Sequence, residues 1–203
     1  MLDSYPSSLI SMARAEWHLP GKVLFAKVWG SRSHNTDLPG SDIDYQAVYA
    51  LPLDDLLSLN PSPETIELKD SQGEPDLQAH EVGKFCRLLL KGNPGIVEML
   101  FTDRMCYCSS EWDKLTAHKE KFLSQDVLKQ YLGYAQGQLT RLNNHTRLHT
   151  GGGDYNTKWA YHMVRLLTDA CRIARGEQPR VWKDGAEREL LIKVRTGSLS
   201  VEV

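Results

Sequence analysis

The spacing of apolar and polar residues divides the chain into a strand-rich first half and a helical second half. Residues 22–29 (KVLFAKVW) form an apolar run between two glycine-containing turns, which predicts a buried strand. Residues 42–49 (DIDYQAVY) alternate between polar and apolar side chains, which predicts a second strand. Because successive strand side chains point to opposite faces, we expect Asp42, Asp44 and Gln46 to share one face of it.

Shorter patterns fill the rest of the first half. Residues 65–69 and 76–80 are weaker strand candidates, joined by a turn at residues 70–73. Residues 84–91 have helical spacing and end at a glycine, and residues 93–100 begin with an Asn-Pro pair that is typical of a helix start. Strands and helices therefore alternate, as in α/β folds.

The second half predicts two amphipathic helices. Apolar residues recur at steps of three and four over residues 127–142, after a capping Ser124. A second apolar stripe covers residues 159–174, after a capping Asn156. The three glycines at residues 151–153 separate the two helices.

The distribution of charge follows the same division. The net charge of the whole chain is −2, but residues 1–125 carry −6 and residues 126–203 carry +4. An acidic half that can hold a metal ion is thus followed by a basic half that can hold phosphate. We predict a mixed α/β domain over residues 1–123 and a helical region over residues 124–203.

Length and composition indicate an ordinary globular protein. The chain has 203 residues, of which 41% are hydrophobic and 25% are charged. No apolar run approaches the roughly 18 residues of a membrane span, and the first residues lack a signal-peptide pattern, so we expect a cytoplasmic protein that does not associate with membranes.

Several other residues have simpler interpretations. His34 lies in a predicted turn, where histidines are usually exposed, and Lys91 at a helix end can complement the helix dipole. The four cysteines show no paired C-x-x-C spacing and are expected to be idle thiols. Cys106 and Cys108 lie in an aromatic, strand-like segment.

The most informative segment joins the two best strand candidates. Gly30 and Ser31 end the first strand, and Asp42 and Asp44 follow eleven positions later. A glycine lets a backbone turn approach a ligand closely, and a serine beside free amide N–H groups can hold phosphate oxygens. Two carboxylates on one strand face lie roughly 7 Å apart along the backbone and can converge on one hard cation. We therefore expect Mg²⁺, or alternatively Mn²⁺.

This ordered motif, GSRSHNTDLPGSDID, resembles the DNA polymerase β-like nucleotidyltransferase superfamily. Three further segments, KFCRLLLKGNPGIVEMLF, YNTKWAYHMVRLL and LLIKVRTGSLSVEV, are similar to the RNA repair pathway DNA polymerase beta family of bacteria and phages. The resemblance covers roughly residues 22–203. It implies a polymerase beta-like mixed sheet with helices, and a C-terminal helical part that closes the nucleotide site.

The resemblance also implies a reaction. A nucleoside monophosphate would pass from a nucleoside triphosphate to an acceptor hydroxyl on an RNA end, a protein or a small molecule, with release of pyrophosphate. Asp42 and Asp44 would be the catalytic metal ligands, and Asp76 would be the third carboxylate. Asp70 and Glu74 are alternatives for this third position.

Cationic residues are candidates for nucleotide binding. On the second predicted helix, Lys158, His162 and Arg165 lie in one polar stripe that continues through Asp169 and Arg172. The alternative interpretation of this stripe is an ordinary solvent-exposed helix face. The residues expected to contact the nucleotide are Gly30, Ser31, Arg32, Lys158, His162 and Arg165.

Two other functions fit the same motif. One is a nucleotide- or RNA-binding module that has lost turnover, and the other is a toxin–antitoxin or phage-defence component of the same fold. The intact pair of carboxylates favours catalysis, because a binding module does not need paired metal ligands. The basic residues lack the interleaved aromatic side chains that would indicate single-stranded RNA.

Overall fold

A computed structural model describes residues 19–69, 75–144 and 155–199. The chain forms two compact units. The first consists of Met1–Ser33, Pro39–Arg87 and Asp103–His118, and the second of His34–Leu38, Leu88–Thr102 and Lys119–Val203. The units are discontinuous in sequence, because two short segments of the first half belong to the second unit, and the domain boundary after residue 123 stays a prediction.

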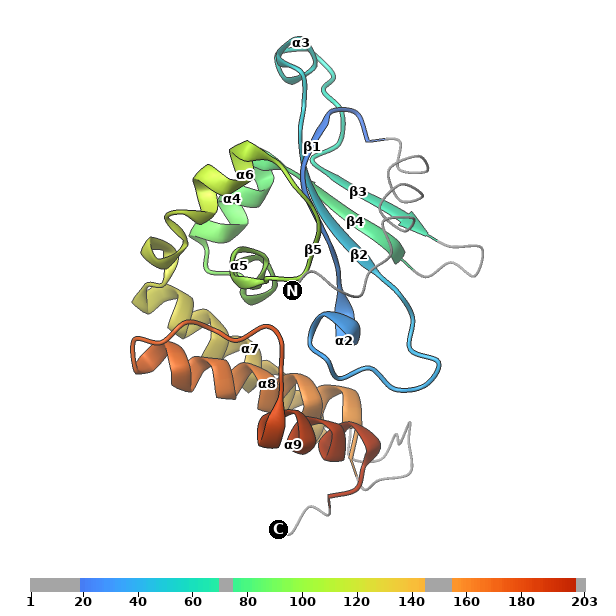
Figure 1. Ribbon diagram of the computed structural model, residues 1–203, viewed down its shortest axis with the longest axis vertical. Helices are drawn as coiled ribbons and strands as arrows, with labels where there is room; N and C mark the ends of the chain where they lie inside the picture. The colour runs from blue at the N-terminus through green and yellow to red at the C-terminus, as the bar shows by residue number, and fades with distance from the viewer. Residues whose placement is uncertain (1–18, 70–74, 145–154, 200–203) are drawn as a thin grey trace. The chain divides into compact units, whose positions relative to one another are not determined.

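The first unit is built on a five-stranded mixed sheet, with the strand order β3-β4-β2-β1-β5 (Figure 1). Its strands are β1 (Lys22–Val28), β2 (Tyr45–Ala50), β3 (Thr65–Lys69), β4 (Pro75–Glu81) and β5 (Met105–Cys108). β2 and β4 are parallel, whereas the other neighbouring strands are antiparallel. The predicted α/β fold with a mixed sheet is confirmed, as are the predicted hairpin of β3 with β4 and the strand around Cys106.

The second strand begins later than its alternating pattern predicts. β2 begins at Tyr45, so Asp42 and Asp44 precede the strand. Pairing with β1 continues one step further back, because the backbone N–H of Trp29 donates to the carbonyl of Asp44 at 2.7 Å. The two aspartates therefore lie on the loop that leads into β2.

Two opposite faces of the sheet carry the core of the first unit. One face buries a cluster of small and aromatic side chains: Ala26, Ala47, Tyr49, Leu77 and Ala79. On the other face, the ring of Phe25 stacks on Trp112 with centroids 4.2 Å apart, and Phe85 packs against the same indole. These aromatic contacts attach α4 (Val82–Leu90) and α6 (Ser110–Thr116) to the sheet. Short helices α2 (Gly30–Ser33) and α3 (Leu53–Leu56) lie in its connections.

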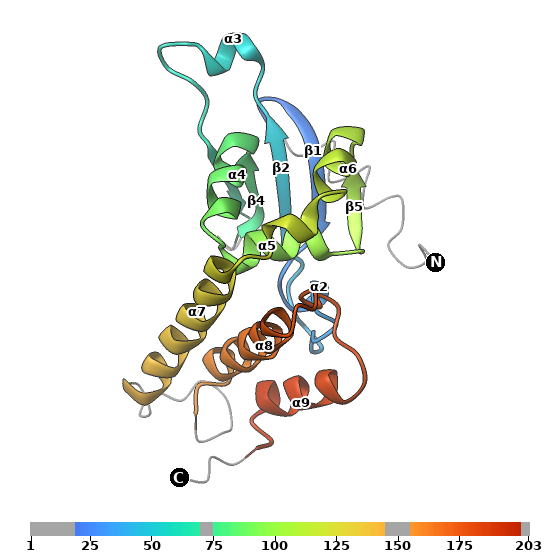
Figure 2. The ribbon, with the colours of Figure 1, turned by 90° about the vertical axis from the view of Figure 1, so that its left-hand side faces the viewer.

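The second unit is helical, and α8 packs against both α7 and α9 (Figure 2). Its elements are α5 (Pro94–Phe101), the 3₁₀ helix η1 (Lys119–Phe122), α7 (Gln125–Asn144), α8 (Thr157–Ala174) and α9 (Gly185–Thr196). The predicted caps are confirmed, because the side chains of Asn93, Ser124 and Asn156 each accept a hydrogen bond from the backbone N–H three residues later.

The core of the second unit differs in part from the predicted apolar stripes. Tyr155, Tyr161 and Leu191 form a buried cluster together with neighbouring residues. On α8, however, Leu167 is 39% exposed, while two charged residues of the predicted polar stripe are buried. The turns predicted at residues 70–73 and 151–153 lie outside the described residues. Among the described helices, none combines the length and apolar character needed to cross a bilayer.

Candidate functional site

Gly30 turns the chain directly after β1. Its φ of 69° lies in the left-handed region, which glycine adopts without steric cost. A Cβ atom on this residue would lie 3.3 Å from Oδ2 of Asp44, which is tighter than an ordinary contact. The predicted phosphate-binding turn and the second predicted metal ligand are thus brought together, with Ser31 next to them at the start of α2.

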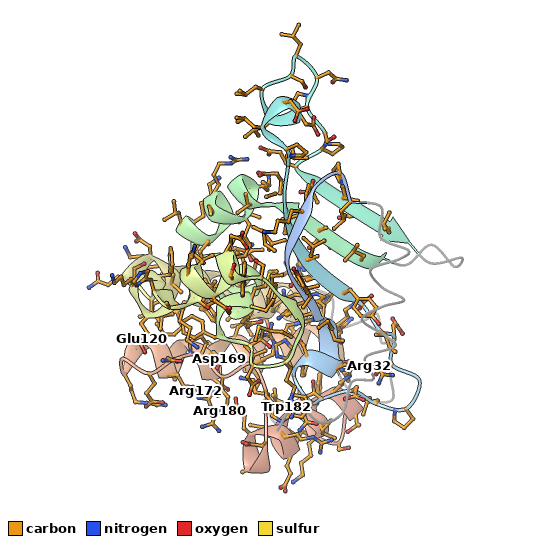
Figure 3. All side chains as sticks on the ribbon, turned by 45° about the horizontal axis from the view of Figure 1, so that its top comes forward. Arg32, Glu120, Asp169, Arg172, Arg180 and Trp182 are labelled. Atoms are coloured by element: carbon orange, nitrogen blue, oxygen red, sulfur yellow. The ribbon has the colours of Figure 1, made fainter. Side chains whose placement is uncertain are left out.

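Arg32 supports the loop that carries Asp42 (Figure 3). Its Nε donates to the carbonyl of Asp42 at 3.0 Å, and its Nη2 donates to the carbonyl of Ser41 at 2.7 Å. The side chain of Asp42 is exposed, and that of Asp44 is half-buried. The structure therefore gives Arg32 a positioning role for the loop, in addition to the predicted contact with a triphosphate, which stays a prediction.

The register of the parallel strands places the third predicted acid. Tyr45 of β2 is paired with Leu77 of β4, so Asp44 and Asp76 each precede one member of this pair. Parallel neighbours lie about 4.8 Å apart, so the backbones of the two aspartates share one level of the sheet. This placement supports Asp76, whereas its alternatives Asp70 and Glu74 lie outside the described residues.

A polar row crosses the sheet beside these acids. Lys27, Gln46 and Gln78 are paired across β1, β2 and β4, and side-chain alternation places them on the face opposite the small-residue cluster. Lys27 is completely buried, and its Nζ lies 4.7 Å from the centre of the Trp29 ring. Sequence analysis overlooked Lys27 because it stands within an apolar run. Its strand parity, matched to that of Gln46, is the signal that could have identified it.

The donor chemistry of the first unit fits a divalent cation. Carboxylate oxygens are the ligands that Mg²⁺ prefers, and the close approach of the Gly30 backbone to Asp44 leaves a cradle that a Cβ atom would fill. Among the side chains that the structure describes, no three His, Cys, Asp or Glu residues gather into a complete metal site. Asp42, Asp44 and Asp76 therefore stay the predicted metal ligands, and only the backbone register of Asp76 is described.

In the second unit, Lys158 and His162 occupy the first turns of α8. Lys158 is exposed. Burial, together with the nearby positive charges of Arg165, Lys158 and Arg195, lowers the pKa of His162 to about 4. The imidazole is consequently neutral at physiological pH, and it can offer one donor and one acceptor to a ligand.

Arg165 and His34 are used differently from what their sequence positions suggest. Arg165 is buried and forms an ion pair with the buried Glu98 of α5. His34 is also buried rather than exposed, so that expectation was wrong: its Nε2 lies 3.7 Å from Glu98, and its Nδ1 is 2.9 Å from the carbonyl of Val181. The guanidinium of Arg165 thus serves the helical core, and its contact with a nucleotide stays a prediction.

The rest of the polar stripe joins an ion-pair network. Asp169 and Arg172 pair at 2.8 Å on α8 (Figure 3). Lys183 donates to Asp169 at 2.8 Å and lies 3.0 Å from Glu187 of α9, which also pairs with Arg172. The interpretation of this stripe as a solvated face is wrong for Arg165 and Asp169, because both are buried against neighbouring elements.

The segment after α2 is held by residues near the end of the chain. The guanidinium of Arg188 donates to the carbonyl of Asn35 at 2.7 Å, and that of Arg195 donates to the carbonyl of Thr36 at 2.9 Å. The backbone N–H of Lys183 donates to the carbonyl of His34 at 3.2 Å. Asn35 itself has a φ of 59°, an uncommon value for a residue other than glycine. These contacts fix the shape of residues 34–36.

Comparison with known proteins identifies the family. The model of the RNA repair pathway DNA polymerase beta family matches residues 6–194. The chain belongs to this family. A curated protein of Enterobacteria phage T4, described as an uncharacterized 38.9 kDa protein in the nrdC-mobD intergenic region, is 22% identical to it over 130 residues. That match covers 59% of this chain and 38% of the phage protein, so this chain spans less than half of that relative's length.

Membership of the RNA repair pathway DNA polymerase beta family indicates a class of activity at the family level. The family contains DNA polymerase beta-like predicted nucleotidyltransferases, and this supports nucleotidyl transfer at the family level. The five-stranded mixed sheet is consistent with that fold. No role was predicted from the sequence for Lys183, Arg188 or Arg195. Arg188 and Arg195 recur seven residues apart on α9, and that helical spacing is the signal that could have paired them.

Proposed function

We propose that the protein transfers a nucleoside monophosphate from a nucleoside triphosphate to an acceptor hydroxyl in the presence of Mg²⁺, or of Mn²⁺ as the alternative ion. One observation carries this proposal: the turn at Gly30 has a positive φ and comes so close to Asp44 that a Cβ atom at position 30 would lie 3.3 Å from Oδ2 of Asp44. A phosphate-binding turn beside a carboxylate is the arrangement that a metal–triphosphate complex requires.

Each residue of the site would have a separate task. The backbone N–H groups at Gly30 and Ser31 would hold phosphate oxygens. Asp42 and Asp44 would hold the divalent cation, and Arg32 would keep the loop with Asp42 in place through its bonds to backbone carbonyls. A magnesium ion bound there would neutralise charge on the triphosphate and favour the ionised form of the acceptor hydroxyl.

The reaction forms one bond and breaks one. The acceptor oxygen bonds to the α-phosphorus, and the bond from that phosphorus to the bridging oxygen of pyrophosphate breaks. Asp76 would take the proton that leaves the acceptor hydroxyl. Its support is the register of the parallel strands, in which Asp44 and Asp76 each precede one member of the Tyr45–Leu77 pair.

The helical unit would contribute to nucleotide binding through α8. Lys158 is exposed, so its ammonium group is accessible to an anionic ligand. The neutral ring of His162 suits a hydrogen bond to a base or a sugar better than an ion pair. We propose an RNA end as the acceptor, and the support for this is the description of the matching family.

The test is transfer of label from each of the four α-³²P nucleoside triphosphates. The protein is incubated with Mg²⁺ or Mn²⁺ and with an RNA pool, a protein pool or neither, and the labelled fraction is identified. We expect label in RNA with the wild type, and at least about a 100-fold loss with Asp44→Asn, because removing a metal ligand removes electrostatic stabilisation of the transition state.

A matched control is Asp54→Asn, which removes an exposed carboxylate of α3 in the same unit. Its activity should equal that of the wild type. Label in protein rather than in RNA would overturn the proposed acceptor and leave nucleotidyl transfer in place. Equal activity of wild type and Asp44→Asn would overturn the assignment of the site, and no label in any fraction would contradict the transfer itself.

A further inference from the structure

A pocket of about 400 Å³ opens within the helical unit, between α7 and the turn that joins α4 to α5. Its size falls within the range of about 300–1,000 Å³ that is typical of small-molecule sites. Its lining residues come from one face of α7, from the end of α4 and from that turn: Leu88, Leu90, Lys91, Asn93, Asp126, Gln130 and Tyr134.

The turn is fixed against α7 by its backbone. Gly92 has a φ of 72°, and a Cβ atom there would lie 2.9 Å from Cα of Val127, so the turn packs directly on the helix. Asn93 is held at both ends of its side chain: its Oδ1 accepts from the N–H of Ile96 at 3.3 Å, and its Nδ2 donates to the hydroxyl of Tyr134 at 3.1 Å. The pocket is therefore preformed.

The polar groups of the pocket are available to a ligand. Within the described part of the chain, no hydrogen bond or ion pair involves the side chains of Lys91 and Gln130. Tyr134 is 46% exposed and Leu90 is 74% exposed, although both are large and apolar. The pocket thus offers an aromatic ring, an aliphatic wall, one amide and one ammonium group, and no described contact within the chain requires the last two.

We propose that this pocket binds one unstacked nucleotide, with the base on the ring of Tyr134 and the phosphate at Lys91. Every nucleobase has a π-face that stacks on an aromatic side chain, and a carboxamide such as Gln130 can pair with the edge of a base. The ammonium group of Lys91 supplies the charge for a phosphate. The carboxylate of Asp126, which also lines the pocket, lies 3.0 Å from the ammonium group of Lys129, and this cation offsets part of its repulsion on a phosphate.

The residues of this pocket are separate from those proposed for catalysis, and no carboxylate–metal contact is needed for binding. The nucleotide could be a free mononucleotide or one unit of a single-stranded RNA. Both present the same base and phosphate to the pocket, and a binding experiment with both probes distinguishes them.

The experiment measures binding in EDTA, where a site that depends on a divalent cation is silent. The probes are the four nucleoside 5′-monophosphates, followed by calorimetry, and fluorescein-labelled oligo(A) and oligo(U) ribonucleotides of six residues, followed by anisotropy. Saturable binding of mononucleotides identifies a free nucleotide as the ligand. Binding of the oligonucleotides alone identifies a strand.

Substitutions then locate the binding. Tyr134→Ala should weaken it roughly tenfold, which corresponds to the loss of one stacked base, whereas Tyr134→Phe keeps the ring and should bind within about twofold of the wild type. Lys91→Ala should weaken binding and reduce its dependence on salt. The matched controls are Leu139→Ala, an exposed apolar residue elsewhere on α7, and Lys121→Ala, an exposed cation of η1; neither lines the pocket.

The proposal is overturned if no probe binds, or if the pocket variants bind as the wild type does while their thermal unfolding is unchanged. Because Tyr134 is half-exposed, its substitution is not expected to unfold the chain. Binding in EDTA is also independent of turnover. If the protein transfers label but binds no probe in EDTA, only the pocket proposal is overturned. If it binds a probe in EDTA but transfers no label, only the proposed catalysis is overturned.

Discussion

The two units use their charged residues in opposite ways. In the sheet unit, the candidate carboxylates stand on a loop before β2, and the supporting contacts of Arg32 are made to backbone carbonyls. In the helical unit, Arg165 is paired with the buried carboxylate of Glu98, and Arg172 is paired with two further acids. The two candidate carboxylates of the first unit lie on a loop, whereas Arg165 and Arg172 of the second unit are paired with carboxylates.

This difference shows that the type of a residue does not determine whether its side chain is accessible to a ligand. Arg32, Lys158 and Arg165 were all candidates for nucleotide binding because they are cations near a motif. The structure shows that Arg165 has a buried partner, that Arg32 is bonded to its own loop, and that Lys158 is exposed. Substitutions in the helical core should therefore reduce stability, and substitutions at the accessible residues should reduce activity.

The largest effect is expected for Glu98→Gln, which leaves the buried guanidinium of Arg165 without its counterion. Breaking a buried ion pair costs about 3–5 kcal/mol. The measurement is urea unfolding followed by circular dichroism. The double variant Glu98→Leu with Arg165→Met removes both charges and should recover most of the loss. If Glu98→Gln is as stable as the wild type, the buried ion pair does not stabilise the helical unit, and the contrast between the two units is wrong.

The next effect is a pH dependence at His162. Its pKa is about 4 in the folded protein and about 6.5 in the unfolded chain. Between these values the unfolded chain binds the additional proton, so the free energy of unfolding should decrease as the pH falls, by at most about 3 kcal/mol. Urea unfolding from pH 7.5 to 4.5 should show a shallower decrease for His162→Gln. Parallel curves would show that α8 does not hold this imidazole neutral.

An intermediate effect is expected at Gly30. Gly30→Ala and Gly40→Ala both place a side chain at a positive φ, of 69° and 82°, which costs about 1–2 kcal/mol. Only the first would press against Asp44, because a Cβ on Gly40 would meet nothing within 4 Å. Both variants should lose similar stability, and Gly30→Ala alone should lose roughly tenfold or more in transfer rate. Equal rates would argue against a functional contact between the turn and Asp44.

The smallest effect is expected for Lys158→Ala. The side chain is exposed, so stability should not change, and the KM for the nucleoside triphosphate should rise about fivefold, the equivalent of about 1 kcal/mol. Lys193→Ala, at another exposed cation of the helical unit, serves as the control. If the KM is the same for both variants and the wild type, Lys158 does not contact the nucleotide.

Local chemistry explains what could be predicted from the sequence. The run of β1 and the caps at Asn93, Ser124 and Asn156 depend on neighbouring residues only, and all are present in the structure. The ordered Gly-Ser and Asp-x-Asp motif likewise placed Gly30 near Asp44, because a short connection between paired strands leaves few other arrangements.

Contacts between distant segments explain what could not be predicted. The periodicity of α8 places Arg165 and Asp169 opposite the apolar residues. Their ion-pair partners, Glu98 of α5 and Lys183 before α9, come from other segments of the chain and are not indicated by that periodicity. The start of β2 was misplaced for a similar reason, since the alternating pattern continues back to Asp42 while the pairing with β1 ends at Asp44. Arg188 and Arg195 were missed because their acceptors are carbonyls, which leave no trace in residue type.

The hydrogen bonds that hold residues 34–36 limit which changes of sequence this segment can accept. Since Arg188 and Arg195 hold main-chain oxygens of Asn35 and Thr36, most amino acids at those two positions present the same acceptors. The side chains are held as well: Nδ2 of Asn35 donates to the carbonyl of Lys183 at 2.9 Å, and the hydroxyl of the buried Thr36 lies 2.7 Å from that of Tyr161. Insertion or deletion of a single residue would shift the carbonyls out of reach, and most substitutions at these two positions would break a side-chain contact. Both the length and the residue types of this segment are therefore constrained.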